Sequence, residues 1–226
     1  MLKIAGLSIS IGSVTILRSV NLELREGVMA GLIGRNGAGK TTLMRSIMGL
    51  LAPRSGFIEF AGSDLLRLPS HRRAHAGIGY MPEDRRLIPE LTVEENILIP
   101  AWATGVKNPN ERLAKIYQMI PELKPFAARR ALQLSGGQQK LAALGRALMC
   151  GTKLLLLDEP FEGVAPALSQ RIAEVVAALK REGLSVIISE SDLQHSTRML
   201  DVVFRIERGE LTRMSSVNAP VHQLES

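Results

Sequence analysis

Eight residues near the start of the chain have the types and spacing of a loop that binds phosphate groups. Residues 34–41 read G-R-N-G-A-G-K-T and match the pattern G-x-x-x-x-G-K-[ST] at every fixed position. Glycines in such a loop let successive backbone N–H groups point inward at phosphate oxygens. The pattern predicts binding of a nucleoside triphosphate, the alternative being a glycine loop that merely turns the chain. The predicted phosphate-binding residues are Gly34, Arg35, Asn36, Gly37, Ala38, Gly39, Lys40, Thr41 and Thr42.

The end of this loop carries two side chains that suit a nucleotide and its metal ion. Lys40 would place an ammonium group on the outer phosphates, and the Thr41 hydroxyl would ligate magnesium. The apolar run 28–33 predicts a buried strand that enters the loop, and residues 42–48 predict the helix that leaves it, with Gly49 as its stop. The start of that helix adds its positive dipole end to the site.

A second chemical feature is a pair of carboxylates that follows four consecutive leucines. Residues 154–157 predict a strand buried on both faces, and Asp158 and Glu159 come directly after it. We expect Asp158 to hold magnesium opposite Thr41. Glu159 is expected to polarise the water that attacks the γ-phosphate. The alternative is two surface acids at the end of a core strand.

The elements that must position these residues alternate between strand and helix. Helical character is expected from about residue 92 to 149, broken into short pieces by Pro100, Pro109, Pro121 and Pro125. Another helix, at 167–181, keeps one apolar face. The predicted class is α/β with a mostly parallel sheet and ligands at the carboxyl ends of its strands. The expected strands are 2–11, 14–24, 57–60, 76–81, 153–157, 185–189 and 202–206.

Composition and charge are ordinary for a globular protein of 226 residues. The net charge of +6 comes from scattered basic pairs without interleaved aromatic residues, so we expect no nucleic-acid partner. Solvated surface charge explains it, with modest affinity for an anionic lipid surface as the alternative. The single Cys150 rules out an internal disulfide and fits a reducing compartment. No apolar run is long enough to span a bilayer, and the start of the chain lacks a signal-peptide layout.

The segment Leu134–Lys140 reads L-S-G-G-Q-Q-K and precedes a predicted helix at 141–149. It resembles the signature motif of ATP-binding cassette (ABC) ATPases, and the order of phosphate loop, signature and acidic strand is similar to that family over essentially the whole chain. The resemblance implies a second anion site, formed by Ser135, Gly136, Gly137 and Gln138 at a helix start, which closes on the γ-phosphate held by a partner subunit. Each chain would then contribute half of two ATP sites.

The resemblance also implies a RecA-like parallel-sheet core with an N-terminal antiparallel β subdomain and an inserted α-helical subdomain. One ABC ATPase domain would cover 1–226. Its nucleotide-binding core would comprise 1–86 and 151–214, its helical subdomain 87–150, and a loosely ordered tail 215–226.

Three stretches, at 77–83, 89–96 and 162–166, resemble the branched-chain (hydrophobic) amino-acid importer ATPases, a group that includes importers of urea and amides. The resemblance implies ATP and Mg²⁺ as cofactors and a peripheral position on the cytoplasmic face of the inner membrane. A second ATPase subunit, more often different than identical, and integral membrane permease subunits would be partners. A solute-binding protein would deliver the substrate, and residues 83–102 would receive a permease coupling helix.

The chain departs from the general ABC pattern at four places. Ile11 stands where an aromatic residue stacks on adenine, and Glu83 replaces a glutamine, which would give magnesium a carboxylate ligand. Ser191 replaces the switch histidine, with His195 as a substitute γ-phosphate contact or simply a solvated or packed histidine. The aspartate expected after the acidic strand is absent from 163–166.

These departures suggest an asymmetric heterodimer in which the site on Lys40 binds ATP firmly and turns it over slowly. A regulatory subunit without useful hydrolysis is an alternative, and the retained Asp158 and Glu159 count against it. A soluble ABC ATPase of DNA repair or translation is a further alternative. Such proteins would need long coiled coils or two fused cassettes, and the sequence has neither.

Overall fold

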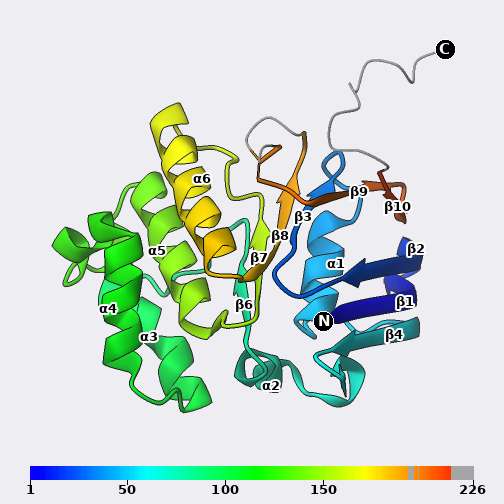
Figure 1. Ribbon diagram of the computed structural model, residues 1–226, viewed down its shortest axis with the longest axis horizontal. Coiled ribbons are helices and arrows are strands. Elements are labelled where there is room, and N and C mark those ends of the chain that lie inside the picture. Colours follow the sequence, from blue (N-terminus) through cyan, green and yellow to red (C-terminus); the bar gives the residue numbers. More distant parts are fainter. Residues whose placement is uncertain (193–195, 198, 215–226) are drawn as a thin grey trace.

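The computed structural model describes residues 1–192, 196–197 and 199–214. The expectations for His195 and for residues 215–226 lie outside these ranges. The described residues form two sheets with helices around and between them (Figure 1). No helix in the described ranges is both long and apolar enough to cross a membrane.

The smaller sheet is antiparallel and lies at one end of the molecule. Its strand order is β2-β1-β4-β5. Buried apolar side chains alternate within each half of β1, as Leu2 and Ile4 and then Leu7 and Ile9, with a register shift between the two pairs. The strands are β1 (Leu2–Ile11), β2 (Val14–Leu24), β4 (Ser55–Phe60) and β5 (Ser63–Asp64).

The larger sheet has the strand order β10-β9-β3-β8-β7-β6. Its strands are parallel except for the edge strand β10, which is antiparallel to β9. All residues of β7 and β8 are buried, including the polar Asp158, Ser189 and Glu190 at their carboxyl ends, as expected for strands covered on both faces of a parallel sheet. Alternate side chains of β7 enter two different cores, with Leu155 and Leu157 in one and Leu154 and Leu156 in the other. The strands are β3 (Met29–Ile33), β6 (Ile78–Met81), β7 (Leu154–Asp158), β8 (Ser185–Glu190), β9 (Val202–Glu207) and β10 (Glu210–Arg213).

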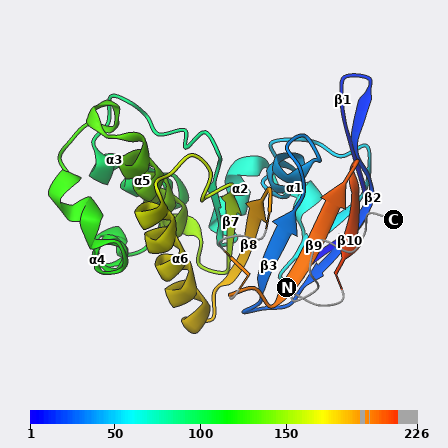
Figure 2. The same cartoon turned by 90° about the horizontal axis from the view of Figure 1, so that it is seen from above.

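The helices cover the two faces of the larger sheet. Helix α1 packs in the core that joins the two sheets, while α3, α4 and α5 gather at the opposite end of the molecule (Figures 1 and 2). The helices are α1 (Lys40–Ile47), α2 (Ser70–His75), α3 (Val93–Thr104), α4 (Pro109–Met119), α5 (Gly136–Cys150) and α6 (Pro166–Arg181), with short 3₁₀ turns at 65–67, 121–126 and 131–133.

One expected helix break is wrong. Pro100 lies inside α3, which continues to Thr104. A proline inside a helix removes one backbone hydrogen bond. Here the helix is fixed at its start by a capping box between Thr92 and Glu95, and its apolar side packs on α5. Packing and capping therefore outweigh the lost bond. The other three prolines do lie at the start of α4 or within the short turn 121–126.

Burial of the central strand predicts a large stability loss on truncation. We expect Leu156→Ala to lower the free energy of unfolding by about 2–5 kcal/mol, because Leu156 is fully buried and the surrounding core cannot close the cavity. Urea denaturation measures this change. Leu50→Ala is the control, since Leu50 is 52% exposed and its truncation should change stability by less than about 1 kcal/mol. Equal losses for both variants would contradict the assigned packing.

Candidate nucleotide site

Parallel pairing brings three chain segments to one edge of the larger sheet. Ile33, the last residue of β3, pairs with Glu190 of β8, and Asp158 at the end of β7 pairs with Ser189. The first loop residue, Gly34, donates its N–H to the Glu190 carbonyl at 3.2 Å. The phosphate-loop pattern, the two acids and Ser191 therefore lie together, as the sequence predicts for the carboxyl ends of parallel strands.

The loop turns sharply into α1, which begins at Lys40. Gly39 occupies the helix cap with a φ of 115°, a conformation that favours glycine, and no side chain caps the first turn. The first N–H groups of α1 therefore have no side-chain acceptor, which is the arrangement that suits an anion at a helix start. Gly34 is equally constrained, because a Cβ there would lie 2.3 Å from the Ile206 carbonyl oxygen.

Lys40 forms a buried ion pair with Glu159. Its Nζ lies 2.9 Å from Glu159 Oε1, and the two side chains are only 5% and 7% exposed. The same ammonium group donates to the carbonyl oxygens of Gly34 and Arg35. A buried charge needs such partners, so any phosphate that reaches Lys40 must replace at least part of this set.

Asp158 is fully buried and accepts hydrogen bonds from three hydroxyl groups. Thr41 and Ser189 donate to its Oδ1 at 3.1 and 2.8 Å, and Tyr80 donates to Oδ2 at 3.2 Å. Burial, followed by the negative charge of Asp158, raises the pKa of the Tyr80 phenol, so Tyr80 remains a donor at neutral pH. The carboxylate is therefore fixed beside the Thr41 hydroxyl.

Thr41 and Asp158 fit a magnesium ion that also binds phosphate. Mg²⁺ prefers oxygen ligands and uses one or two carboxylates together with phosphates and water. The described residues contain no group of three or more His, Cys, Asp or Glu that could hold a metal alone, so phosphate oxygens would have to complete the shell. Glu83 is exposed, but partial desolvation and then the nearby carboxylates of Glu162 and Asp158 raise its pKa. Its role as a metal ligand stays a prediction.

Glu159 is held by its backbone as well as by its side chain. Its φ of 48° lies in the left-handed region, which costs a non-glycine residue on the order of 1–3 kcal/mol unless surrounding contacts compensate. Its N–H donates to Ser189 Oγ at 2.9 Å. Ser191 lies 3.4 Å from Glu159 Oε1 and 3.1 Å from Asn36 Oδ1, and thus connects the acid to the phosphate loop.

The segment 135–138 lies apart from this cluster. Ser135 caps α5, accepts from the Gln138 N–H at 3.3 Å and donates its own N–H to Gln138 Oε1 at 3.0 Å. Ser135 and Gly136 are exposed. Within the described residues, no hydrogen bond or ion pair joins 135–138 to the loop 34–41. This helix start is thus open to another molecule.

Ile11 lies at the end of β1. It is 53% exposed and pairs with Val14 across a tight hairpin that projects from the smaller sheet (Figure 2). An exposed aliphatic side chain can pack against the face of an adenine ring. Its predicted contact with adenine stays a prediction.

Three contributors to the site escaped sequence reasoning. Tyr80 and Ser189 orient Asp158, and Lys140 Nζ donates to the Glu159 carbonyl oxygen at 2.8 Å. Each comes from a different strand or helix, so no local pattern connects it to the acids. The sequence did place Tyr80 and Ser189 near the carboxyl ends of the predicted strands 76–81 and 185–189. That placement alone could have suggested that they lie near the two acids.

Comparison with known proteins gives the family context. A family model described as ABC transporter matches residues 17–162. A high-affinity branched-chain amino acid transport ATP-binding protein of Pseudomonas aeruginosa is 37% identical over 93% of this chain and 91% of its own length. A lipopolysaccharide export system ATP-binding protein of Haemophilus influenzae is 32% identical over 87% of this chain and 82% of its own length.

Solved structures agree with these sequence matches. An ATP-binding cassette of an ABC transporter in its ADP conformation is 30% identical, with a TM-score of 0.80 over 94% of this chain and 89% of that one. A bacterial ABC transporter cassette described as dimeric is 25% identical, with a TM-score of 0.86 over 97% of this chain and all of that one.

The buried ion pair predicts how nucleotide binding responds to loss of the lysine. We expect Lys40→Met to weaken ATP binding by roughly 10- to 150-fold, which corresponds to loss of a charge-assisted contact of about 1.5–3 kcal/mol. Calorimetric titration with magnesium and ATP measures the dissociation constant. Lys3→Met is the control, because Lys3 is a surface residue with a 57% exposed side chain. Unchanged binding in Lys40→Met would exclude Lys40 as a phosphate ligand.

Proposed function

Because the chain belongs to the ATP-binding proteins of ABC transporters, we propose that it energises import of branched-chain or other hydrophobic amino acids, or of related small solutes such as urea or amides. ATP hydrolysis coupled to transport is the activity of the family. The Pseudomonas relative, with 37% identity over most of both chains, supports the substrate class. The observation that carries the hydrolytic assignment is the contact of Lys40, Thr41, Asp158 and Glu159 at one sheet edge.

In the proposed mechanism, ATP binding rearranges the Lys40–Glu159 ion pair. The γ-phosphate takes over the ammonium group of Lys40, since its oxygens carry more negative charge than a single carboxylate. Glu159 then becomes free to accept a hydrogen bond from the attacking water and to withdraw its proton. Thr41 and Asp158 would hold magnesium, which would supply positive charge to neutralise the phosphates. Ser191 can donate to a phosphate oxygen but cannot supply a positive charge.

A second ATPase subunit completes the site in this proposal. The open helix start at Ser135–Gln138 supports it, because the described residues leave that anion site without a phosphate loop of the same chain. The partner's phosphate loop would face Ser135, and the partner's signature would face Lys40. The serine at 191 favours a heterodimer with one slower site, built on this chain's loop.

An apolar surface beside β6 suits a permease subunit. A cavity of about 270 Å³ opens there between α1, α2, α3 and α5, with Leu50, Tyr80 and Arg86 among its lining residues. Leu50 lines this cavity and is 52% exposed, and α3, whose Pro100 also lines it, carries the 58% exposed Trp102; Ile88, at 41%, is exposed two residues after the lining residue Arg86. A short amphipathic helix could cover them, and the same contact would keep the subunit at the cytoplasmic face of the membrane.

Export is the second candidate direction. The Haemophilus relative belongs to an export system and is 32% identical to this chain. Uptake of labelled leucine into vesicles that contain the complete transporter distinguishes the two directions. Import requires ATP on the cytoplasmic side and a solute-binding protein, whereas an exporter would accumulate no leucine under these conditions.

Unequal sites predict unequal effects of the same substitution. We expect Glu159→Gln to reduce total ATP hydrolysis of the assembled pair by less than about threefold. Replacement of the partner's catalytic glutamate should reduce it at least about tenfold. Steady-state phosphate release measures both. Glu174→Gln, at an exposed position of α6, is the control. Equal losses at the two glutamates would contradict the asymmetry but leave the ATPase assignment intact.

The apolar surface predicts a loss of assembly when a charge is introduced. We expect Trp102→Glu to lower the amount of permease that co-purifies with this subunit by about tenfold or more, since a desolvated carboxylate would oppose docking. ATP affinity should stay unchanged. Val14→Glu, which alters an equally exposed apolar residue in the other sheet, should leave co-purification unchanged. Full retention of the permease by Trp102→Glu would place the contact elsewhere.

A further inference from the structure

Lys140 is a buried cation whose contact with Glu159 the proposed hydrolysis mechanism does not use. Its residue exposure is 4%, although Ser135 and Gly136, a few residues earlier in the same segment, are exposed. Its Nζ donates to the carbonyl oxygen of Glu159 at 2.8 Å and to that of Glu162 at 2.5 Å. A lysine from α5 therefore binds the turn that follows β7.

This turn determines where the Glu159 carboxylate points. Glu159 has a left-handed backbone, and its carbonyl oxygen also accepts the Glu162 N–H at 3.3 Å. A strained residue keeps its conformation only where neighbouring groups hold it. Ser189 holds the Glu159 N–H, Lys40 holds the carboxylate, and Lys140 holds the carbonyl oxygen. Lys140 is the member of this set that comes from α5.

Lys140 remains suited to this contact despite its burial. Desolvation, and then the positive charge of Arg85, lower the pKa of Lys140, while the carboxylates of Glu162, Glu159 and Glu83 act in the opposite direction. A side chain of similar length without a donor would leave the Glu162 carbonyl oxygen without this partner and the Glu159 carbonyl oxygen with the Glu162 N–H alone. Loss of hydrogen-bond partners costs free energy, so the turn would be held less firmly.

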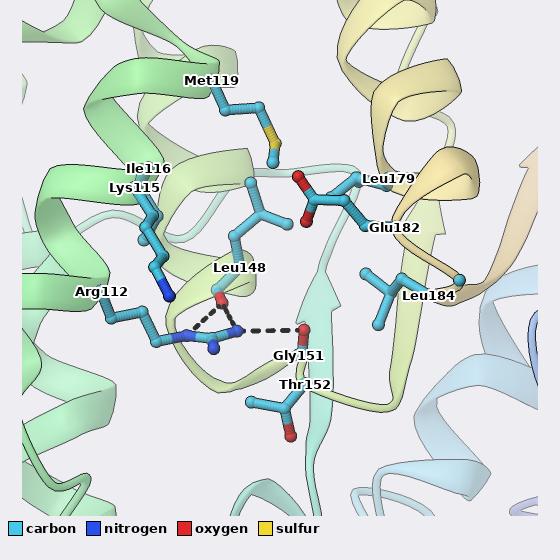
Figure 3. Close-up of a pocket in the computed structure, with 11 residues that line it drawn as sticks. Arg112, Lys115, Ile116, Met119, Leu148, Gly151, Thr152, Leu179, Glu182 and Leu184 are labelled. Atoms are coloured by element: carbon cyan, nitrogen blue, oxygen red, sulfur yellow. Dashed lines mark hydrogen bonds between the residues drawn. The ribbon is translucent and has the colours of Figure 1, made fainter.

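Helix α5 connects this contact to the exposed signature segment. Ser135 caps the helix, and Lys140 lies about 7.5 Å farther along its axis. The opposite end of α5 is fixed as well, because Arg112 of α4 donates to the carbonyl oxygens of Leu148 and Gly151 (Figure 3). Because α5 is one continuous helix, we expect it to move as a rigid unit. A displacement of Ser135 would then displace Lys140 as well.

We propose that Lys140 is a positioning residue through which the signature segment controls Glu159 of the same chain. When Ser135 and its neighbours close on the partner's γ-phosphate, α5 takes one position and Lys140 fixes the Glu159 turn in its hydrolytic conformation. ATP in the partner's site thereby promotes hydrolysis at this chain's own site. The inference rests on the proposed roles of Glu159 and of the signature segment. It supplies a route between the sites in a chain that lacks an aspartate at 163–166.

A double-mutant cycle tests the proposal in the assembled transporter. The partner ATPase subunit carries a glutamine in place of its catalytic glutamate, so that phosphate release reports only on Glu159. The four forms of this chain are wild type, Ser135→Ala, Lys140→Met and the double variant. We expect each single change to lower kcat by about tenfold, with the double variant close to either single one. KM for ATP should change less than about twofold in Lys140→Met.

Other outcomes would overturn the proposal. Independent effects would lower kcat of the double variant by about a hundredfold, and a wild-type kcat in Lys140→Met would remove the residue from catalysis. If the methionine variant does not fold, Lys140→Gln, which keeps one amide donor, replaces it in the cycle and should show the same non-additivity. Lys115→Met, at a 70% exposed position of α4, is the matched control.

Failure of this inference and failure of the proposed function give different results. If the wild-type assembly hydrolyses ATP and transports solute while Lys140→Met shows normal kcat, only the role of Lys140 is wrong. If the wild-type assembly shows no hydrolysis that depends on Glu159, the proposed function itself is wrong.

Discussion

Parallel hydrogen bonding among β3, β8 and β7 is the constraint on which the rest of the structure depends. It aligns Ile33 with Glu190 and Asp158 with Ser189, so three chain segments far apart in sequence end at one edge. The strands are buried on both faces, which fixes their register because a shift of one residue would exchange the two cores. Helices α1 and α5 then approach this edge from the two sides of the sheet, each with a lysine that contacts Glu159.

The sequence predicted the parts of the fold that depend on local pattern. The bounds of β1 and β2 agree to the residue with those expected, since the apolar pattern of each strand is a local signal. The continuation of α3 past Pro100 was not predicted, because packing on α5 outweighs the lost hydrogen bond. Strands β5 and β10 and helix α2 are short and have little periodicity, so they were missed as well.

For the site, too, the sequence predicted the residues that belong to local motifs and missed the contacts between distant segments. Spacing alone identified Lys40, Thr41, Asp158 and Glu159 as candidates, and the structure places the four side chains in contact as two pairs. Spacing contained no information on the ion pair itself or on Tyr80, Ser189 and Lys140. Their contacts join positions 19 to 119 residues apart and follow from the parallel sheet and the course of α5.

The exposed side chain of Trp102 has a practical consequence. It is the only tryptophan in the chain and is 58% exposed on α3, the helix whose Pro100 lines the cavity described above. An indole ring emits at longer wavelength in water than in an apolar environment, so its fluorescence reports its own solvation. The native protein therefore contains an optical probe for encounters at that surface. Detergent, lipid or a docking helix can each be titrated against it, without a chemical label or an engineered residue.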